Sequence, residues 1–138
     1  MNITLQQAEK AIAAAQRESQ KRGELTAFAV MDTGGNLVAF SRMNGANLMT
    51  IDVALGKAYT ASICNLDTID VNPFIQPGQA LFGMGLVLQQ ARSLVPFAGG
   101  IVLRQQGEVI GALGVSGARA AQIDHEIAQS ALAEFEQV

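Results

Sequence analysis

Apolar residues recur at helical spacing near the start of the chain. The positions that share one helical face are Leu5, Ala8, Ile12 and Ala15. Their separation of three or four residues predicts an amphipathic helix. Thr4 and Gln7 have the spacing of a capping box, and Gly23 follows a basic pair, as a C-terminal cap does. The sequence therefore predicts a helix that begins after Thr4 and is closed by Gly23.

Two pairs of short apolar stretches predict β-hairpins. The first pair spans residues 26–31 and 37–42, and the second spans residues 101–104 and 109–115. Residues 32–36 contain two glycines and an asparagine, which tolerate the positive φ of a tight turn. Gly107 permits the turn of the second pair. We therefore expect two antiparallel hairpins.

Between the hairpins, residues 50–64 predict a second helix that is apolar on both sides. One face carries Ile51, Leu55, Ala58 and Ser62, and the opposite face carries Val53, Lys57, Thr60 and Cys64. A helix of this kind is usually buried on both sides. We expect one side to pack on the sheet and the other to meet a ligand cleft or a partner subunit.

Residues 65–90 are almost uncharged and are interrupted by prolines and glycines. This pattern predicts a short helical turn and then a long excursion over residues 76–83, and long apolar loops are more often functional than idle. A last helix is predicted over residues 120–137. Its expected inner face carries Ala120, Ile127, Ala128, Ala131 and Phe135. Hairpins interleaved with helices favour an α+β fold with an antiparallel sheet, in one domain over residues 1–138.

The composition adds an inference about surfaces. Charged residues make up 15% of the 138 residues, well below the ~25% typical of soluble proteins. A chain this poor in charge is expected to bury surface beyond its own core, against another subunit or a ligand. The net charge is −3, so the basic footprint that a nucleic-acid binder needs is absent from the sequence.

Residue counts exclude further classes. The chain has one cysteine, Cys64, and one histidine, His125, whereas a structural zinc site needs about four such ligands. No intramolecular disulfide can form. The first residues show no signal peptide, and no run of ~18 apolar residues predicts a membrane span. The sequence therefore predicts a cytoplasmic protein with no metal site and no membrane or nucleic-acid partner.

Charged side chains on the predicted helices are the first candidates for chemistry. Lys57 is either a lysine extending to a rim or subunit interface, or the cation that holds an anionic ligand group. Asp124 lies within the apolar stripe of the last helix and must find donors. It either accepts from amides or Ser116 in the nearby turn, or serves as a pocket acid. His125, at the edge of that stripe, is either a boundary histidine or an axial haem ligand.

Glycines and two further polar residues complete the candidate set. Gly99 and Gly100 either mark close backbone approach or leave bare backbone for a ligand, and their spacing fits no phosphate-loop motif. Ser116 stands in a sequence that lacks the second glycine of a nucleophile elbow, so we expect it to hydrogen-bond locally. Arg42 flanks the first hairpin and is expected to pair at the surface, or else to hold a ligand carboxylate.

Several blocks in the same order resemble a known family. They are residues 30–37, 42–46, 54–61, 76–78, 81–83, 97–100, 107–117 and 122–124. The chain resembles the GlcG/HbpS-like family, which also supplies the C-terminal domain of PduO-type proteins. The resemblance implies a profilin-like fold, with an antiparallel sheet and helices on both faces, and assembly into homo-oligomers. It also implies haem or corrinoid-pathway partners in some members, and a place beside glycolate or diol metabolism in others.

Three hypotheses about function follow. The first is a homo-oligomeric protein that binds a small molecule, haem or a related tetrapyrrole, and is accessory to small-acid or diol metabolism. Its pocket would use Lys57, Arg42, Gly99, Gly100, Ser116 and Asp124, with His125 as a candidate haem ligand. The second is a cofactor-free enzyme in which Asp124 or His125 moves a proton on a small carboxylic acid. The third is an interaction module for a metabolic enzyme. The sequence favours binding over catalysis and does not identify a cofactor.

Overall fold

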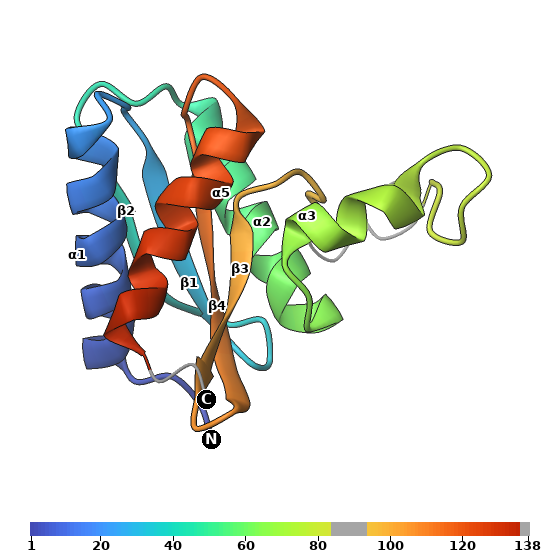
Figure 1. Cartoon of the computed structure of the whole chain (residues 1–138), viewed down its shortest axis with the longest axis horizontal. Coiled ribbons are helices and arrows are strands. Elements are labelled where there is room, and N and C mark those ends of the chain that lie inside the picture. Colours follow the sequence, from blue (N-terminus) through green and yellow to red (C-terminus); the bar gives the residue numbers. More distant parts are fainter. Residues whose placement is uncertain (84–93, 136–138) are drawn as a thin grey trace.

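The structure is a computed structural model that describes residues 1–83 and 94–135. Its strands are β1 (Ala27–Asp32), β2 (Leu37–Arg42), β3 (Gly100–Gln105) and β4 (Glu108–Ser116). Its helices include α1 (Leu5–Lys21), α2 (Met49–Cys64), α3 (Thr68–Val71) and α5 (Ala121–Gln129), with 3₁₀ helices η1 (Asn72–Ile75) and η2 (Ser130–Glu134). The predicted order of elements and the α+β class are both confirmed (Figure 1).

The two hairpins join into one antiparallel sheet with strand order β2-β1-β4-β3. β1 and β4 are the central strands, and they pair from Ala27 with Ser116 to Asp32 with Gly111. The second hairpin turns through Gln106 and Gly107, both at positive φ, which is the conformation that a two-residue hairpin turn requires. In this strand order, β2 and β3 lie at opposite edges of the sheet.

Helices cover both faces of the sheet, as expected. On one face α1 and α5 pack on a cluster of large side chains that includes Phe28, Val30 and Leu113. On the other face α2 packs on the small residues Ala27 and Ala29. Because the side chains on this second face are small, the α2 backbone lies close to the sheet. The polar residues of α2 are thereby positioned at the surface of the sheet.

The start of the chain confirms the cues for the first helix. Thr4 and Gln7 form the complete capping box, and Arg22 is the C-cap residue. Gly23 follows it at φ +71°, the left-handed conformation that ends many helices.

The predicted last helix is too long. Regular α-helix ends at Gln129 and continues as the 3₁₀ helix η2. The Ser130 hydroxyl donates to the Ile127 carbonyl and helps to close the α-helix there. Ala120 is the exposed N-cap residue, not part of the inner face, whereas Ala128 and the other predicted inner residues are buried. The end predicted at residue 137 lies outside the described residues.

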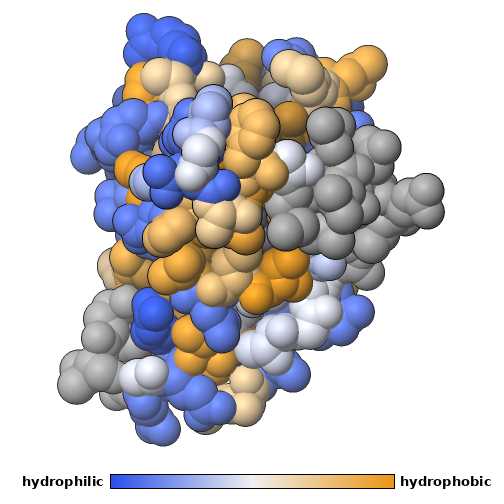
Figure 2. All heavy atoms as spheres, turned by 90° about the vertical axis from the view of Figure 1, so that its right-hand side faces the viewer, coloured by the Kyte–Doolittle hydropathy of each residue, from blue (hydrophilic) through white to orange (hydrophobic). Residues whose placement is uncertain are grey.

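Residues 66–83 form an arm that projects from the sheet beside β3 (Figure 1). The arm comprises α3, η1 and the turns that follow. It includes the excursion predicted over residues 76–83. The remainder of that loop, residues 84–90, lies outside the described residues. On the face from which the arm extends, hydrophobic side chains gather across the middle (Figure 2). Phe74, Phe82 and Phe97 are among the exposed apolar residues of this part of the molecule.

Two polar residues fasten the root of the arm to the edge strand. The Thr68 hydroxyl donates to the Phe97 carbonyl at 2.6 Å and accepts from the Gly100 amide at 2.9 Å. The Asp67 carboxylate accepts from the Val102 amide at 2.9 Å. The Gly100 and Val102 amides belong to the outer edge of β3, which no strand of the described chain pairs. An unpaired edge is otherwise open to another chain.

Candidate functional site

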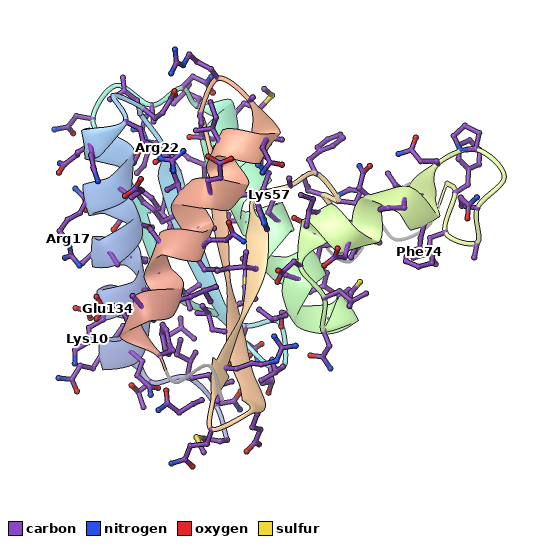
Figure 3. The ribbon with its side chains drawn as sticks, viewed as in Figure 1. Lys10, Arg17, Arg22, Lys57, Phe74 and Glu134 are labelled. Carbon is purple, nitrogen blue, oxygen red and sulfur yellow. The ribbon has the colours of Figure 1, made fainter. Side chains whose placement is uncertain are left out.

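A buried ion pair connects α2 to α5. The Lys57 ammonium lies 3.0 Å from the Asp124 carboxylate and also donates to the Val115 carbonyl at 3.0 Å. The other oxygen of Asp124 accepts from the Ala118 amide at 2.9 Å. The Lys57 and Asp124 side chains are 3% and 5% exposed, so solvent does not reach the pair. Lys57 lies inside the body of the molecule, whereas Phe74 stands on the arm (Figure 3).

Burial opposes both charges of this pair. It lowers the pKa of Lys57 and raises the pKa of Asp124, because removal from water disfavours each ionised form. The attraction between the two groups and the hydrogen bond that joins them act in the opposite direction. The ionised forms of Lys57 and Asp124 are therefore stabilised by each other and not by the buried environment.

The glycine pair closes the space above these charges. A Cβ on Gly99 would lie 2.7 Å from the Lys57 ammonium and 2.5 Å from the Val115 carbonyl oxygen. A Cβ on Gly100 would lie 2.5 Å from the Lys57 carbonyl oxygen and 2.8 Å from Thr68. No larger residue fits either position without movement of backbone. Of the two alternatives for these glycines, the structure shows close backbone approach.

Four of the predicted site residues therefore meet: Lys57, Gly99, Gly100 and Asp124. Ser116 lies at the end of β4, one residue beyond the carbonyl that Lys57 binds, and is buried. Arg42 does not join them. It lies at the end of β2, on the far side of the sheet from Gly100, and its guanidinium donates to the Ala46 carbonyl at 2.9 Å.

His125 is buried next to the pair but faces another direction along α5. It is 6% exposed, and its Nδ1 atom has no hydrogen-bond partner in the part of the chain that the structure describes. Successive residues of a helix point about 100° apart, so His125 does not share the contacts of Asp124.

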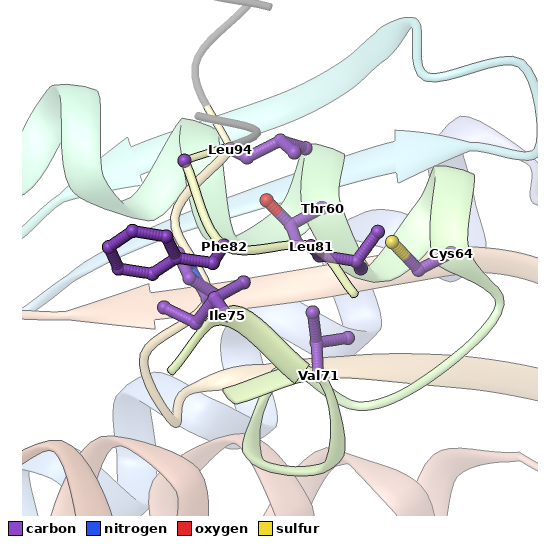
Figure 4. A pocket seen from close by; sticks show the side chains of 9 residues that line it. Thr60, Cys64, Val71, Ile75, Leu81, Phe82 and Leu94 are labelled. Atoms are coloured by element: carbon purple, nitrogen blue, oxygen red, sulfur yellow. The ribbon is translucent and has the colours of Figure 1, made fainter. Parts of the chain in front are cut away.

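An apolar hollow lies between α2 and the arm (Figure 4). It has a volume of about 270 Å³ and is lined by Thr60, Cys64, Val71, Ile75, Leu81, Phe82, Gly83, Leu94 and Pro96. Uncharged side chains form the whole lining. Thr60 turns its hydroxyl to the protein, because it donates to the Gly56 carbonyl and accepts from the Val95 amide. Burial raises the pKa of the Cys64 thiol, because removal from water disfavours the thiolate.

Sequence reasoning did not assemble this hollow. Its lining comes from the end of α2, two faces of the arm and the segment before β3, and the lining positions follow no helical or strand period. The signal in the sequence was the almost uncharged stretch 65–90. Within it, the excursion over residues 76–83 was predicted to be a functional loop, but the residues that would face it across a hollow were not predicted.

Two absences hold within residues 1–83 and 94–135. No group of three or more His, Cys, Asp or Glu side chains is arranged to hold a metal ion. No helix there is both long and apolar enough to span a membrane.

Known proteins resemble this chain over most of its length. A model of the family described as "haem degrading protein HbpS-like" matches residues 3–133. An uncharacterized 15.0 kDa protein from the dhaT–dhaS intergenic region of Citrobacter freundii is 38% identical over 130 residues, 94% of this chain and 89% of that protein. Corrinoid adenosyltransferase PduO of the same organism is 30% identical over 133 residues, but the matched region covers 96% of this chain and only 39% of the transferase.

A solved structure has the same fold over nearly the whole chain. The crystal structure of a PduOC–heme complex superposes with a TM-score of 0.90 and 30% sequence identity, over 99% of this chain and 96% of that one. The fold and the resemblance expected from the sequence blocks are both confirmed.

Proposed function

The chain belongs to the HbpS-like family, and from that premise we propose that it binds haem or a closely related tetrapyrrole in the apolar hollow between α2 and the arm. The observation that carries the proposal is the hollow itself, because none of its lining residues is charged and most of them are apolar. Support also comes from the similar PduOC structure, which is a complex with heme. The family match over residues 3–133 supports one domain over residues 1–138.

The lining fits the apolar face of a tetrapyrrole. Ligand sites are mostly apolar and enclose roughly 300–1,000 Å³, so a hollow of about 270 Å³ would cover part of the macrocycle and leave its polar edge outside. Cys64 is the one lining residue with a side chain that binds haem iron in other proteins. Bound haem would supply an iron centre whose ligands are visible in its absorption spectrum.

His125 is not among the residues that line this hollow. The prediction that His125 ligates haem iron therefore stays a prediction, and the spectra described below test it together with Cys64.

The buried ion pair has a positioning role in this proposal. Lys57 and Asp124 pack beneath Gly99 and Gly100, and the chain leading into these glycines carries Pro96, which is a wall of the hollow. From the arm, the side-chain amide of Asn72 donates to the Pro96 carbonyl at a distance of 3.0 Å. The ion pair thus fixes the position of the wall that contains Pro96, and Asn72 connects this wall to the arm, which forms the other wall.

We propose further that the chain assembles into a homo-oligomer and serves a metabolic enzyme as an accessory. The charge-poor composition supports burial of surface between copies. The similarity to part of PduO, a corrinoid adenosyltransferase, supports an enzyme as the protein partner. Both statements extend the haem proposal, and the oligomeric state is tested separately in the Discussion.

A haem titration of two matched variants tests the proposed site. Phe82 lines the hollow, whereas Phe74 is a comparably exposed phenylalanine of the arm that does not. We expect Phe82→Ser to weaken haem binding about tenfold or more, because ~1.5–3 kcal/mol of apolar burial is lost. Phe74→Ser should bind like the unaltered protein. The measurement is the change in Soret absorbance on addition of haem.

Equal affinities for the two variants would contradict the location of the site, and an unaltered protein that gives no stoichiometric Soret shift would contradict haem binding itself. Cys64→Ser and His125→Phe then identify the iron ligand. We expect Cys64→Ser to move the Soret band while apolar binding persists.

A further inference from the structure

A groove runs between α1 and the edge strand β2, at the side of the molecule opposite the arm (Figure 1). Its volume is about 470 Å³, and residues of both elements line it, among them Leu5, Glu9, Ala13, Ala39 and Phe40. A smaller hollow of about 270 Å³ shares Gln16 and Ser41 with the groove and extends it to Arg42. The two together are called the α1–β2 groove below. It shares no lining residue with the apolar hollow proposed to bind haem.

The backbone of β2 turns unpaired groups to the outside of the sheet. The Met43 amide donates to the Thr26 carbonyl, and Ser41 lies opposite Phe28 in the same register. In an antiparallel pair, residues that turn their N–H and C=O groups toward the partner strand alternate with residues that turn them away. Phe40 and Arg42 therefore turn these groups away from β1. No strand of the described chain lies beyond β2 to pair with them.

The two edges of the sheet differ in protection. At the β3 edge, Thr68 and Asp67 of the arm accept from backbone amides. At the β2 edge, residues 37–41 include no charged residue and no proline, which are the residues that most often prevent an edge strand from pairing. The pairing of β2 with β1 is regular from Ala39 to Arg42. This part of β2 is therefore a flat template for an extended chain.

The α1–β2 groove carries a charge of each sign. Arg42 is exposed, and its guanidinium donates to the Ala46 carbonyl, which occupies one of the five N–H donors of an arginine. Glu9 is exposed, and no described residue forms an ion pair with it. Both charged groups are thus available to side chains of opposite charge.

The register of β2 places these charges on opposite faces of the sheet. Ala39 lies opposite Val30, which belongs to the core under α1, so the Ala39 side chain shares the face that Glu9 borders. Arg42 lies opposite Ala27, which belongs to the core under α2. In a strand added beside β2, the residue next to Arg42 and the residue next to Ala39 would likewise point to opposite faces.

We propose that the α1–β2 groove binds an extended segment of a partner protein, which adds to β2 as a further strand. The segment is antiparallel to β2, as every neighbouring pair of strands in this sheet is antiparallel. It carries an acidic residue opposite Arg42 and, later in its sequence, a basic residue opposite Ala39 and near Glu9. The residues between these two are apolar.

The proposal deepens the accessory role proposed above and rests on it for the kind of protein that supplies the segment. It does not rest on haem binding, because the groove and the apolar hollow have different linings. It also gives Arg42 the task of holding a carboxylate that the sequence left open, but a carboxylate of a protein and not of a small ligand.

A synthetic peptide tests the proposal on the intact protein. The probe is fluorescein-Thr-Glu-Val-Val-Lys-Thr-amide, and its binding is followed by fluorescence anisotropy. Antiparallel addition puts its glutamate opposite Arg42, its second valine opposite Phe40 and its lysine opposite Ala39. We expect saturable binding. The peptide with glutamate and lysine exchanged should bind about fivefold more weakly or worse, because both exposed ion pairs are lost.

Methylation of single peptide amides distinguishes strand addition from other modes of binding. The second valine lies opposite Phe40, so its amide donates to the outward carbonyl of β2. N-methylation there should weaken binding roughly tenfold, because a hydrogen bond is lost and a methyl group enters the strand interface. The first valine turns its amide away from β2. N-methylation of the first valine is the matched control and should leave the affinity unchanged.

A change of charge on the protein locates the segment. We expect Arg42→Glu to weaken binding of the probe and to bind more tightly the peptide in which lysine replaces the glutamate. The matched control is Lys10→Glu, which makes the same change of charge on an exposed residue of α1 (Figure 3) that does not line the groove. It should not alter the preference between the two peptides.

Four results would overturn the proposal. They are binding that does not saturate, equal affinities for the two N-methylated peptides, an Arg42→Glu variant that still prefers the probe, and hydrogen–deuterium exchange of residues 37–42 that the probe does not slow. Slow exchange of these residues that depends on protein concentration without peptide would assign the edge to a second copy and would equally contradict it. Haem titration of Arg42→Glu should match the unaltered protein, which distinguishes failure of this groove from failure of the haem site.

Discussion

Lys57 and Asp124 are the single residues on which the interior depends most. Removal of one partner from a buried pair leaves the other charge without compensation and costs ~3–5 kcal/mol. We therefore expect Lys57→Met to lower the free energy of unfolding by that amount, measured by urea denaturation. Lys10→Met on the exposed side of α1 is the control, and surface substitutions of that kind stay within about 0.5 kcal/mol.

The double variant Lys57→Met, Asp124→Asn separates charge from packing. The asparagine oxygen still accepts from the Ala118 amide, but no buried charge remains. We expect it to recover most of the stability lost in Lys57→Met. A double variant no more stable than Lys57→Met would show that packing, and not the unpaired carboxylate, causes the loss.

The sequence was informative about these residues one at a time. A lysine on an apolar helix and an aspartate within an apolar stripe both need partners, and each is the other's partner. The sequence also placed Gly99 and Gly100 with them, but around a ligand pocket, whereas in the structure the two glycines pack directly against the pair. The sequence put Arg42 in the same proposed pocket, but the structure does not bring Arg42 to these residues. Strand order cannot be read from local sequence patterns, and β2 lies at the opposite edge of the sheet from β3.

Among the elements, the contact of α2 with β4 depends on one missing side chain. A Cβ on Gly114 would meet the backbone of Ala54 and lie 2.6 Å from the Ala58 nitrogen. We expect Gly114→Ala to destabilise the protein by at least ~1–3 kcal/mol, because the backbone of α2 must shift. The measurement is the urea midpoint.

Gly34→Ala is the control for this substitution. A Cβ there would lie 2.9 Å from the Asn36 side-chain nitrogen, which is flexible and can move aside. If Gly114→Ala were as stable as Gly34→Ala, that result would contradict the close contact between α2 and the sheet.

Elements with local signals were predicted well, and those without them were not. α1 has a capping box and a closing glycine, so both ends were visible in the sequence. α5 has neither at its ends, and its early conversion to the 3₁₀ helix η2 was missed. The apolar hollow was missed for a related reason, because residues as far apart as Thr60 and Phe82 meet only after the arm has folded back.

At the scale of the whole molecule, α2 and the residues beside its ends expose several large apolar side chains, namely Leu48, Ile63 and Leu66. Leu55 and Tyr59 continue this stripe at helical spacing and are half-buried against the small residues of the sheet. Leu48 is 74% exposed and Ile63 is 43% exposed. Apolar stripes of this kind usually mark contact surfaces.

We expect native mass spectrometry to show a homo-oligomer assembled through this stripe. Ile63→Glu and Leu48→Glu should shift the assembly toward monomer, because a carboxylate would be buried without a partner. Leu37→Glu on β2 should leave the assembly intact, although Leu37 is 53% exposed. A monomeric unaltered protein, or equal dissociation by all three variants, would contradict the assignment.

The strand order β2-β1-β4-β3 has a consequence for synthesis of the chain. β1 can pair with β2 soon after both emerge from the ribosome, but its other neighbour, β4, is made only shortly before the last helix. Translation proceeds at about 5–20 residues per second. For several seconds the nascent hairpin therefore presents the unpaired edge of β1, which is open to pairing with another chain. A chain truncated before β4 is expected to aggregate rather than to form a smaller folded unit.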